Sequence, residues 1–126
     1  MKKIYFNKLI RDKIPEKIKS KGCNLKIKTL NELLFETELL KKVGEEASAL
    51  PVAKNNEELI SELADILDVI DEIKKFKNIT DEQLKTAQKV NFDKKGGFDQ
   101  RLFLYWTSDD GYKTNETQYS EPDSKK

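Results

Sequence analysis

The sequence contains no histidine, and its single cysteine is Cys23. A serine–histidine–aspartate triad and a histidine-ligated zinc site are therefore excluded. One thiol can form neither an internal disulfide nor a four-thiolate zinc site. Any bound metal ion must be held mainly by oxygen atoms, which favours Mg²⁺, Mn²⁺ or Ca²⁺.

Glycine, proline and long apolar runs are also scarce. The 126 residues include only 5 glycines and 3 prolines, and charged and hydrophobic residues each make up 37%. This balance is typical of a helical protein with one apolar stripe on each helix. No apolar run approaches the roughly 20 residues of a membrane span, and the N-terminal stretch lacks an apolar core of signal-peptide length. We therefore expect a cytoplasmic protein that makes no membrane contact.

The net charge of +1 conceals an uneven distribution of charge. Residues 1–28 hold ten Lys/Arg and two acids, whereas residues 29–72 hold three Lys and twelve acids. A basic arm and an acidic centre could together bind a polyphosphate and its metal ion, or they could simply attract each other in the fold. Because the net charge is near zero and few aromatics accompany the basic residues, we do not expect nucleic-acid binding.

Capping and breaking signals divide the chain into helices. Thr29–Glu32 and Thr80–Gln83 have the spacing of capping boxes, while Pro15 is typical of a helix start and Gly22, Pro51 and Gly96-Gly97 of helix ends. The expected helices cover residues 15–21, 32–50, 57–77 and 80–95. Long helices joined by short breaks pack antiparallel, so the two central helices should form a hairpin.

The remaining segments complete the predicted architecture. Residues 24–30 alternate polar and apolar side chains, which fits a short strand or an extended link. The aromatic segment 98–106 is expected to pack back on the helices, as a strand or an extended stretch. Residues 107–126 are polar and lack periodicity, which predicts a disordered tail. We therefore predict an all-α antiparallel helical bundle over residues 1–106, with short extended segments at the N-terminal arm and after the last helix.

Three acids interrupt the apolar faces of the two central helices. On a helical wheel, Glu62 falls at the edge of an apolar face and Asp65 lies on the same side at i+3. Glu46 occupies the edge of the preceding helix, so a hairpin can turn all three toward one cleft. Crowded carboxylates repel one another unless a divalent cation compensates them. The pattern predicts a Mg²⁺ site, with Mn²⁺ as a substitute, although a solvated helix edge paired with lysines would have the same spacing.

Glu36 also falls on the apolar face of its helix. Two interpretations remain open: Glu36 pairs with a lysine or arginine of the basic N-terminal arm, or the helical wheel is out of phase near the start of this helix.

Four motifs follow one another in a recognisable order. They are KLIRDKIPE (8–16), KVGEEASAL (42–50), SELADILDVI (61–70) and KKGGFDQRLFL (94–104). Together they resemble the MazG-like all-α nucleoside triphosphate pyrophosphohydrolases, and most closely the phosphoribosyl-ATP pyrophosphohydrolase-like subgroup. The resemblance covers about residues 4–104.

The resemblance implies roles for the acidic residues. The family hallmark is Glu-Glu-x-x-Glu on one helix and Glu-x-x-Asp on the next, which together bind Mg²⁺. Glu45 and Glu46 match the first pair, Glu62 and Asp65 match the second motif, and Ala49 replaces the third glutamate. The implied metal ligands are Glu46, Glu62 and Asp65. Glu45 and Glu46 are the implied catalytic residues, with Glu45 as the general base in the absence of histidine.

The resemblance also gives the basic motifs a role. Arg11 and Lys13 in the N-terminal loop, and Lys94 and Lys95 before the glycines, would bind the oxygens of a triphosphate. An alternative is that Lys94 and Lys95 only complement the dipole at a helix end that the two glycines terminate.

The implied function is Mg²⁺-dependent hydrolysis of a nucleoside triphosphate, or a phosphoribosyl-ATP-like nucleotide, to the monophosphate and pyrophosphate. A homodimer or higher homo-oligomer is the expected assembly, and removal of non-standard nucleotides is a possible role. Two alternatives remain open on the sequence. One is a catalytically weak nucleotide- or metal-binding module, because Ala49 replaces a ligand, and the other is a structural helical interaction protein.

Overall fold

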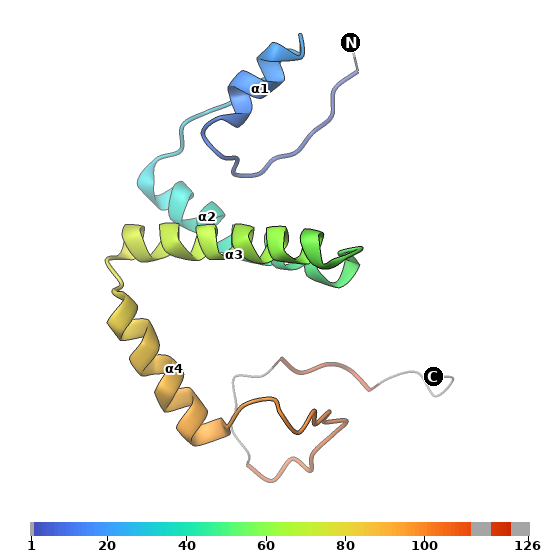
Figure 1. Ribbon diagram of the computed structural model, residues 1–126, viewed down its shortest axis with the longest axis vertical. Coiled ribbons are helices and arrows are strands. Elements are labelled where there is room, and N and C mark those ends of the chain that lie inside the picture. The colour runs from blue at the N-terminus through green and yellow to red at the C-terminus, as the bar shows by residue number, and fades with distance from the viewer. Residues whose placement is uncertain (1, 112–116, 122–126) are drawn as a thin grey trace.

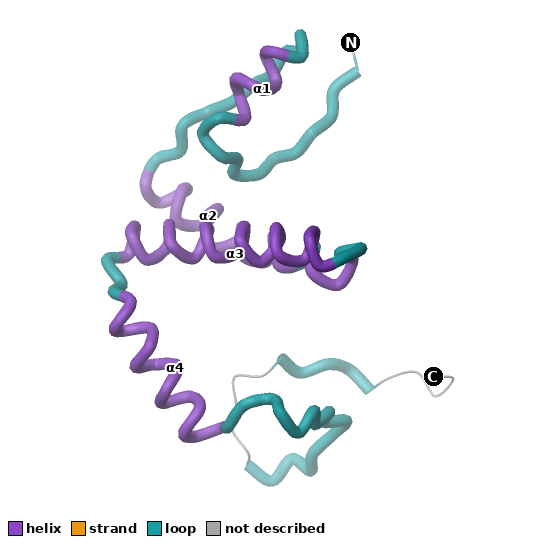
Figure 2. The backbone as a smooth tube through the Cα atoms, viewed as in Figure 1, coloured by secondary structure: helices purple, strands orange, loops and turns teal. Residues whose placement is uncertain are grey.

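The computed structural model describes residues 2–111 and 117–121, and its regular structure over these ranges is entirely helical (Figures 1 and 2). The elements are α1 (Ile14–Ser20), α2 (Glu32–Ala47), the short 3₁₀ helix η1 (Leu50–Val52), α3 (Asn56–Lys77) and α4 (Asp81–Lys95). The all-helical class is therefore confirmed. Neither 24–30 nor 98–106 forms a strand.

Helix α2 begins at the predicted residue, Glu32, but its N-cap and its C-terminal end differ from the prediction. Its N-cap is Asn31, whose side chain accepts a hydrogen bond from the Leu34 N–H at 2.9 Å, so the capping box predicted at Thr29 is wrong. Asparagine caps at least as well as threonine and lies directly before the first helical residue. The α-helix ends at Ala47, and the chain then turns into η1, where Pro51 is accommodated at the first positions.

The caps of α3 and α4 follow local sequence signals. Asn55 accepts a hydrogen bond from the Glu58 N–H at 2.9 Å, and Asn78 ends α3 in the left-handed conformation with φ 58° and ψ 40°. The capping box at Thr80 and Gln83 is present with both reciprocal bonds, at 3.1 and 2.8 Å, as predicted. Because two residues separate Asn78 from α4, the chain changes direction sharply there (Figure 1).

Helices α2 and α3 lie side by side and run in opposite directions (Figure 1). Phe35 in the first turn of α2 meets Phe76 in the last turn of α3. Glu36 pairs with Lys77 at the same end, so its predicted partner in the N-terminal arm was wrong. The central hairpin is therefore the packing unit of the chain. Among the described residues, Leu39, with 4% of its surface exposed, is the one buried side chain.

Helix α4 leads away from the α2–α3 pair (Figures 1 and 2). Among the described helices, only α2 and α3 pack extensively, so a single chain leaves the predicted bundle open. No helix in the described part of the chain is both long and apolar enough to cross a membrane.

The segment 98–106 does not pack on the helices, which corrects the prediction. Phe98 is 95% exposed and Trp106 is 81% exposed. Among the described aromatic rings, Phe103 contacts only Tyr105, with centroids 5.0 Å apart. The apolar composition of this segment indicates that its surface becomes covered by protein. It does not specify whether the same chain or another chain covers that surface.

The predicted tail is described only in part. Residues 107–111 and 117–121 are exposed and contain no helix or strand. The rest of the predicted tail lies outside the described residues.

Candidate metal centre

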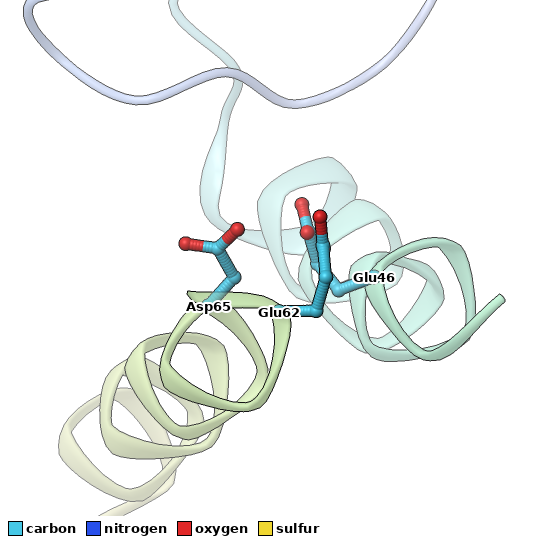
Figure 3. A group of neighbouring side chains, drawn as sticks. All are labelled: Glu46, Glu62 and Asp65. Atoms are coloured by element: carbon cyan, nitrogen blue, oxygen red, sulfur yellow. The ribbon is translucent and has the colours of Figure 1, made fainter. Parts of the chain in front are cut away.

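The three predicted ligands come together where α2 ends and α3 begins. Each of Glu46, Glu62 and Asp65 offers a carboxylate oxygen, and these oxygens all lie within 4.8 Å of one another. Figure 3 shows Glu46 projecting from α2 beside Glu62, with Asp65 one turn further along α3. All three side chains are half-buried, so the cluster is partly shielded from water.

The antiparallel hairpin explains why these residues meet. Glu46 is in the last turn of α2, and Glu62 and Asp65 are in the first half of α3. Because the chain reverses through η1, the end of one helix faces the beginning of the next. Glu62 and Asp65 share a helix side through their i, i+3 spacing.

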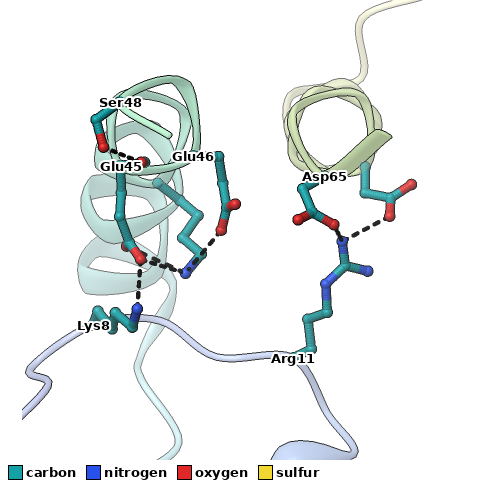
Figure 4. Close-up of polar contacts among 8 residues, drawn as sticks. Lys8, Arg11, Glu45, Glu46, Ser48 and Asp65 are labelled. Atoms are coloured by element: carbon teal, nitrogen blue, oxygen red, sulfur yellow. Dashed lines mark hydrogen bonds and ion pairs between the residues drawn. The ribbon is translucent and has the colours of Figure 1, made fainter. Parts of the chain in front are cut away.

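Lysine and arginine side chains compensate most of this negative charge, as Figure 4 shows. Lys42, on α2, lies 3.1 Å from Glu45 and 3.3 Å from Glu46. Arg11 donates from one Nη atom to Asp65 at 2.9 Å and to Asp68 at 2.8 Å. Among the described residues, Glu62 has no ion-pair partner. The cluster therefore retains one uncompensated carboxylate between two compensated ones.

Glu45 lies beside the cluster on a different side of α2. Lys8 donates a hydrogen bond to it at 2.8 Å, and Lys42 approaches from the same helix. The hydrogen bond from Lys8, followed by that from Lys42, lowers the pKa of the Glu45 carboxyl below its ordinary value. Its role as the base stays a prediction, and it requires the pair with Lys8 to open.

The hydrogen bond to Asp68 is the main reason that the pKa of Arg11 is raised above its ordinary value. Arg11 therefore stays a cation at any physiological pH. Arg11 is thus the predicted phosphate-binding residue that the structure brings into contact with the cluster, through Asp65.

The other predicted phosphate-binding residues differ in their positions relative to the cluster. Lys13 precedes α1, where its side chain is exposed and makes no capping bond. Lys94 and Lys95 occupy the last turn of α4, which leads away from the α2–α3 pair (Figure 1). Within one chain, the structure does not bring these two lysines to the carboxylates.

Two cationic residues of the site were missed at the sequence level. Lys42 could have been found, because it precedes Glu45 by three residues and Glu46 by four on the same helix. Lys8 gave no such signal, since its contact with Glu45 depends on the path of an irregular segment.

Ala49 follows Glu46 in a tight turn. Its N–H donates to the Glu46 carbonyl oxygen at 3.2 Å, and the residue is half-buried with φ −78° and ψ −19°. Although the α-helix has ended, the helical backbone direction continues through this residue. Position 49 therefore lies one turn beyond Glu46, where it presents a methyl group instead of a carboxylate.

The three half-buried carboxylates suit a hard divalent cation. Mg²⁺ and Mn²⁺ prefer oxygen ligands, and Mg²⁺ commonly retains water molecules alongside one or two carboxylates. Glu62 has no ion-pair partner among the described residues. A bound cation would therefore compensate more negative charge at Glu62 than at Glu46 or Asp65.

Comparison with known proteins returned no match to a family model, to a curated protein or to a solved structure. The function is therefore inferred from the residues and their geometry.

Proposed function

We propose that this chain is a MazG-like, Mg²⁺-dependent pyrophosphohydrolase that acts on a nucleoside triphosphate or a phosphoribosyl-ATP-like nucleotide. The observation that carries the proposal is the meeting of Glu46, Glu62 and Asp65 from two helices, with carboxylate oxygens within 4.8 Å. The order of the four sequence motifs supports the same family. The products would be a nucleoside monophosphate and pyrophosphate, which suits the removal of non-standard nucleotides.

Glu46, Glu62 and Asp65 are the residues that would hold the metal ion, with Mn²⁺ as a substitute. When bound, Mg²⁺ would supply charge compensation for the triphosphate and acidify a water molecule. Glu45 would accept a proton from the attacking water once its pair with Lys8 has opened. Arg11 and Lys13 would bind phosphate oxygens at the open side of the cluster.

We further propose that the active assembly is a homodimer or a higher homo-oligomer. A single chain leaves many large apolar side chains exposed, including Leu33, Ile60, Leu67 and Phe92. A second copy that covers these surfaces would complete the antiparallel bundle. Because α4 leads away from its own hairpin, Lys94 and Lys95 would then serve the carboxylate cluster of another copy.

A cytoplasmic location is part of the same proposal. Its support is Cys23, which is exposed and free, as is common for thiols in a reducing compartment.

A catalytically weak metal–nucleotide binding module is the second candidate, and Ala49 favours it. This residue leaves the cluster one carboxylate short of the family motif, at a half-buried position beside Glu46. Fewer charged ligands would weaken metal binding, so nucleotide could bind without being hydrolysed.

One experiment separates the two candidates. Purified protein is incubated with a panel of ordinary and modified nucleoside triphosphates and Mg²⁺ or Mn²⁺, and pyrophosphate release is measured. Metal-dependent release from at least one nucleotide supports the enzyme. A rise in the melting temperature with nucleotide and metal, without release, supports the binding module. Neither effect with any nucleotide would overturn both and leave a structural interaction protein.

A further inference from the structure

The N-terminal arm, residues 2–13, passes along the open side of the carboxylate cluster (Figure 4). Its two contacts reach different helices, because Lys8 binds Glu45 on α2 and Arg11 binds Asp65 and Asp68 on α3. Leu9 and Ile10, between these two cations, are half-buried. The arm is therefore tied to both halves of the hairpin, on either side of the proposed metal centre.

Asp65 belongs to two interactions that oppose each other. It is one of the three clustered carboxylates, and its Oδ1 atom already accepts a hydrogen bond from Arg11 at 2.9 Å. A divalent ion held by Asp65 would place two further positive charges close to the guanidinium. Like charges at such a separation repel strongly in a partly shielded site. Occupation of the cluster by metal and closure of the Arg11–Asp65 pair therefore disfavour each other.

Asp68 offers Arg11 a second carboxylate that lies outside the cluster. The same Nη atom reaches Asp68 Oδ2 at 2.8 Å, one helical turn beyond Asp65. Asp68 is exposed, whereas Asp65 is half-buried. Arg11 can thus lose Asp65 and remain attached to α3.

We propose that Arg11 is a built-in competitor of the metal ion and that the N-terminal arm regulates metal binding. Without metal, Arg11 neutralises Asp65 and holds the arm closed over the cluster. With metal, Arg11 moves to Asp68 alone, which acts as its anchor and not as a metal ligand. The guanidinium is then free on one side to bind a phosphate group, so metal binds before nucleotide. This inference rests on the proposed metal centre and adds its regulation.

The test measures Mn²⁺ affinity of the full chain by the electron paramagnetic resonance signal of free Mn²⁺. Arg11→Met removes the competing cation and should tighten binding by about three- to tenfold. Lys3→Met is the matched control, because Lys3 is an exposed cation of the same arm and makes no hydrogen bond or ion pair with the described residues of α2 or α3. A change of less than about twofold is expected there. Equal effects of the two substitutions, or weaker binding in Arg11→Met, would overturn the proposal.

A second measurement distinguishes competition from a purely structural tie. If Arg11 only fastens the arm, Arg11→Met lowers the melting temperature equally with and without saturating Mn²⁺. Competition predicts a smaller loss with Mn²⁺, because the Asp65 pair is then already open. The melting-temperature rise caused by Mn²⁺ should therefore be larger in Arg11→Met than in the unmodified protein. An equal rise contradicts competition.

Asp68→Asn provides an independent variant. Asp71 is an exposed aspartate one turn further along the same helix. If Asp68 only anchors Arg11, its loss should weaken Mn²⁺ binding no more than the loss of Asp71 does. Asp71→Asn is thus the matched control for the loss of one negative charge. Binding weakened much further in Asp68→Asn than in Asp71→Asn would make Asp68 a ligand and contradict the anchor role.

The outcomes also separate this inference from the proposed function. If the unmodified chain binds Mn²⁺, Glu62→Gln weakens that binding and Arg11→Met changes nothing, only the competition is wrong. If the unmodified chain and Arg11→Met both fail to bind Mn²⁺ at millimolar concentration, the metal centre and the inference fall together.

Discussion

Phe35 and Phe76 meet edge to face across the α2–α3 pair, with ring centroids 5.3 Å apart and ring planes at 75°. Glu46 follows Phe35 by the same number of residues as Asp65 precedes Phe76. In an antiparallel pair, that symmetry places Glu46 opposite Asp65 when the two rings are in contact. The aromatic contact thus fixes the register that assembles the carboxylate cluster at the other end of the hairpin.

Phe76→Ala should therefore act on both stability and metal affinity. The half-buried ring contributes about 2 kcal/mol through its packing with Phe35. Loss of the contact also loosens the register, so Mn²⁺ affinity should fall although no ligand has changed. Urea unfolding and Mn²⁺ titration measure the two effects. Tyr119→Ala, which removes an 89% exposed ring near the C-terminus, is the control and should alter neither. Unchanged metal affinity in Phe76→Ala would show that the register does not depend on this contact.

Glu62→Gln tests the metal centre directly. The substitution keeps the shape of the side chain and removes the carboxylate that has no ion-pair partner in the described part of the chain. Metal affinity should fall at least about tenfold, which is roughly 1.4 kcal/mol, and any turnover should be abolished. Stability without metal should stay equal or rise, because repulsion from Glu46 and Asp65 decreases.

Glu72→Gln is the matched control for Glu62→Gln, since Glu72 is an exposed acid later on α3. Isothermal titration with Mg²⁺ compares the two variants. Equal affinity in the Glu62 variant and the unmodified protein would remove Glu62 from the ligand set.

Ala49→Glu should supply the carboxylate that the MazG-like motif has at this position. Position 49 lies one turn beyond Glu46, and the residue there is half-buried. A fourth negative charge is attracted by a divalent ion more than it is repelled by carboxylates that the ion already compensates. We expect tighter Mg²⁺ binding and pyrophosphate release at least about tenfold faster, or roughly 1.4 kcal/mol of barrier. The opposite outcome is that the unmodified protein already releases pyrophosphate rapidly and Ala49→Glu slows this release. That result would mean that another ligand has replaced the missing glutamate.

The lowered pKa of Glu45 predicts how the free energy of unfolding depends on pH. Its pKa is lower in the folded chain than the ordinary glutamate value of about 4.3. The resulting stabilisation is fully present above the unfolded pKa and is lost as the pH falls through the folded pKa. Glu45→Gln should therefore be less stable at pH 7 by at most about 1 kcal/mol, since these pairs are partly exposed to solvent. The difference should shrink as the pH falls below the ordinary glutamate value and disappear once Glu45 is protonated in the folded chain as well.

Urea unfolding at several pH values measures this difference. Lys8→Met removes the main cause of the pKa shift and should reproduce much of the loss at pH 7. The double variant should lose less than the sum of the two single variants. Strict additivity would mean that the Lys8–Glu45 pair does not form in solution.

Removal of residues 107–126 should leave the helical hairpin intact. Residues 107–111 and 117–121 are exposed and have no regular structure, so no large packing energy is expected from them. The melting temperature of the shortened chain should stay within about 2 °C, as for surface changes that remove no buried contact. Thermal unfolding followed by circular dichroism measures it. A large decrease would show that the tail packs on the hairpin or on another copy.

Capping signals in the local sequence predicted the helices well. They failed where two residues were both suitable as the N-cap of the same helix. Thr80 and Gln83 cap α4 as expected, because each group bonds to a residue three positions away. At α2, Thr29 and Asn31 both had a suitable side chain, and the residue nearer the helix caps it. The carboxylate cluster could be predicted because it needs only helical spacing and one chain reversal.

The contacts of the N-terminal arm could not be predicted in the same way. Lys8 and Arg11 reach their partners through an irregular path that includes Asn7 with φ 48°. No periodicity describes such a path, so charge asymmetry indicated only that the basic arm and the acidic centre attract each other. Likewise, the aromatic residues of 98–106 predicted a covered surface, and the single chain leaves that surface open.

Leu39 is the one side chain that the described part of a lone chain buries. A core of this size offsets little of the conformational entropy lost on folding. In the proposed assembly, most of the apolar surface would be removed from water only when copies meet, so folding and association would be a single equilibrium. Dilution would then act as a denaturant, and the amount of protein that a cell makes would set the fraction that is folded.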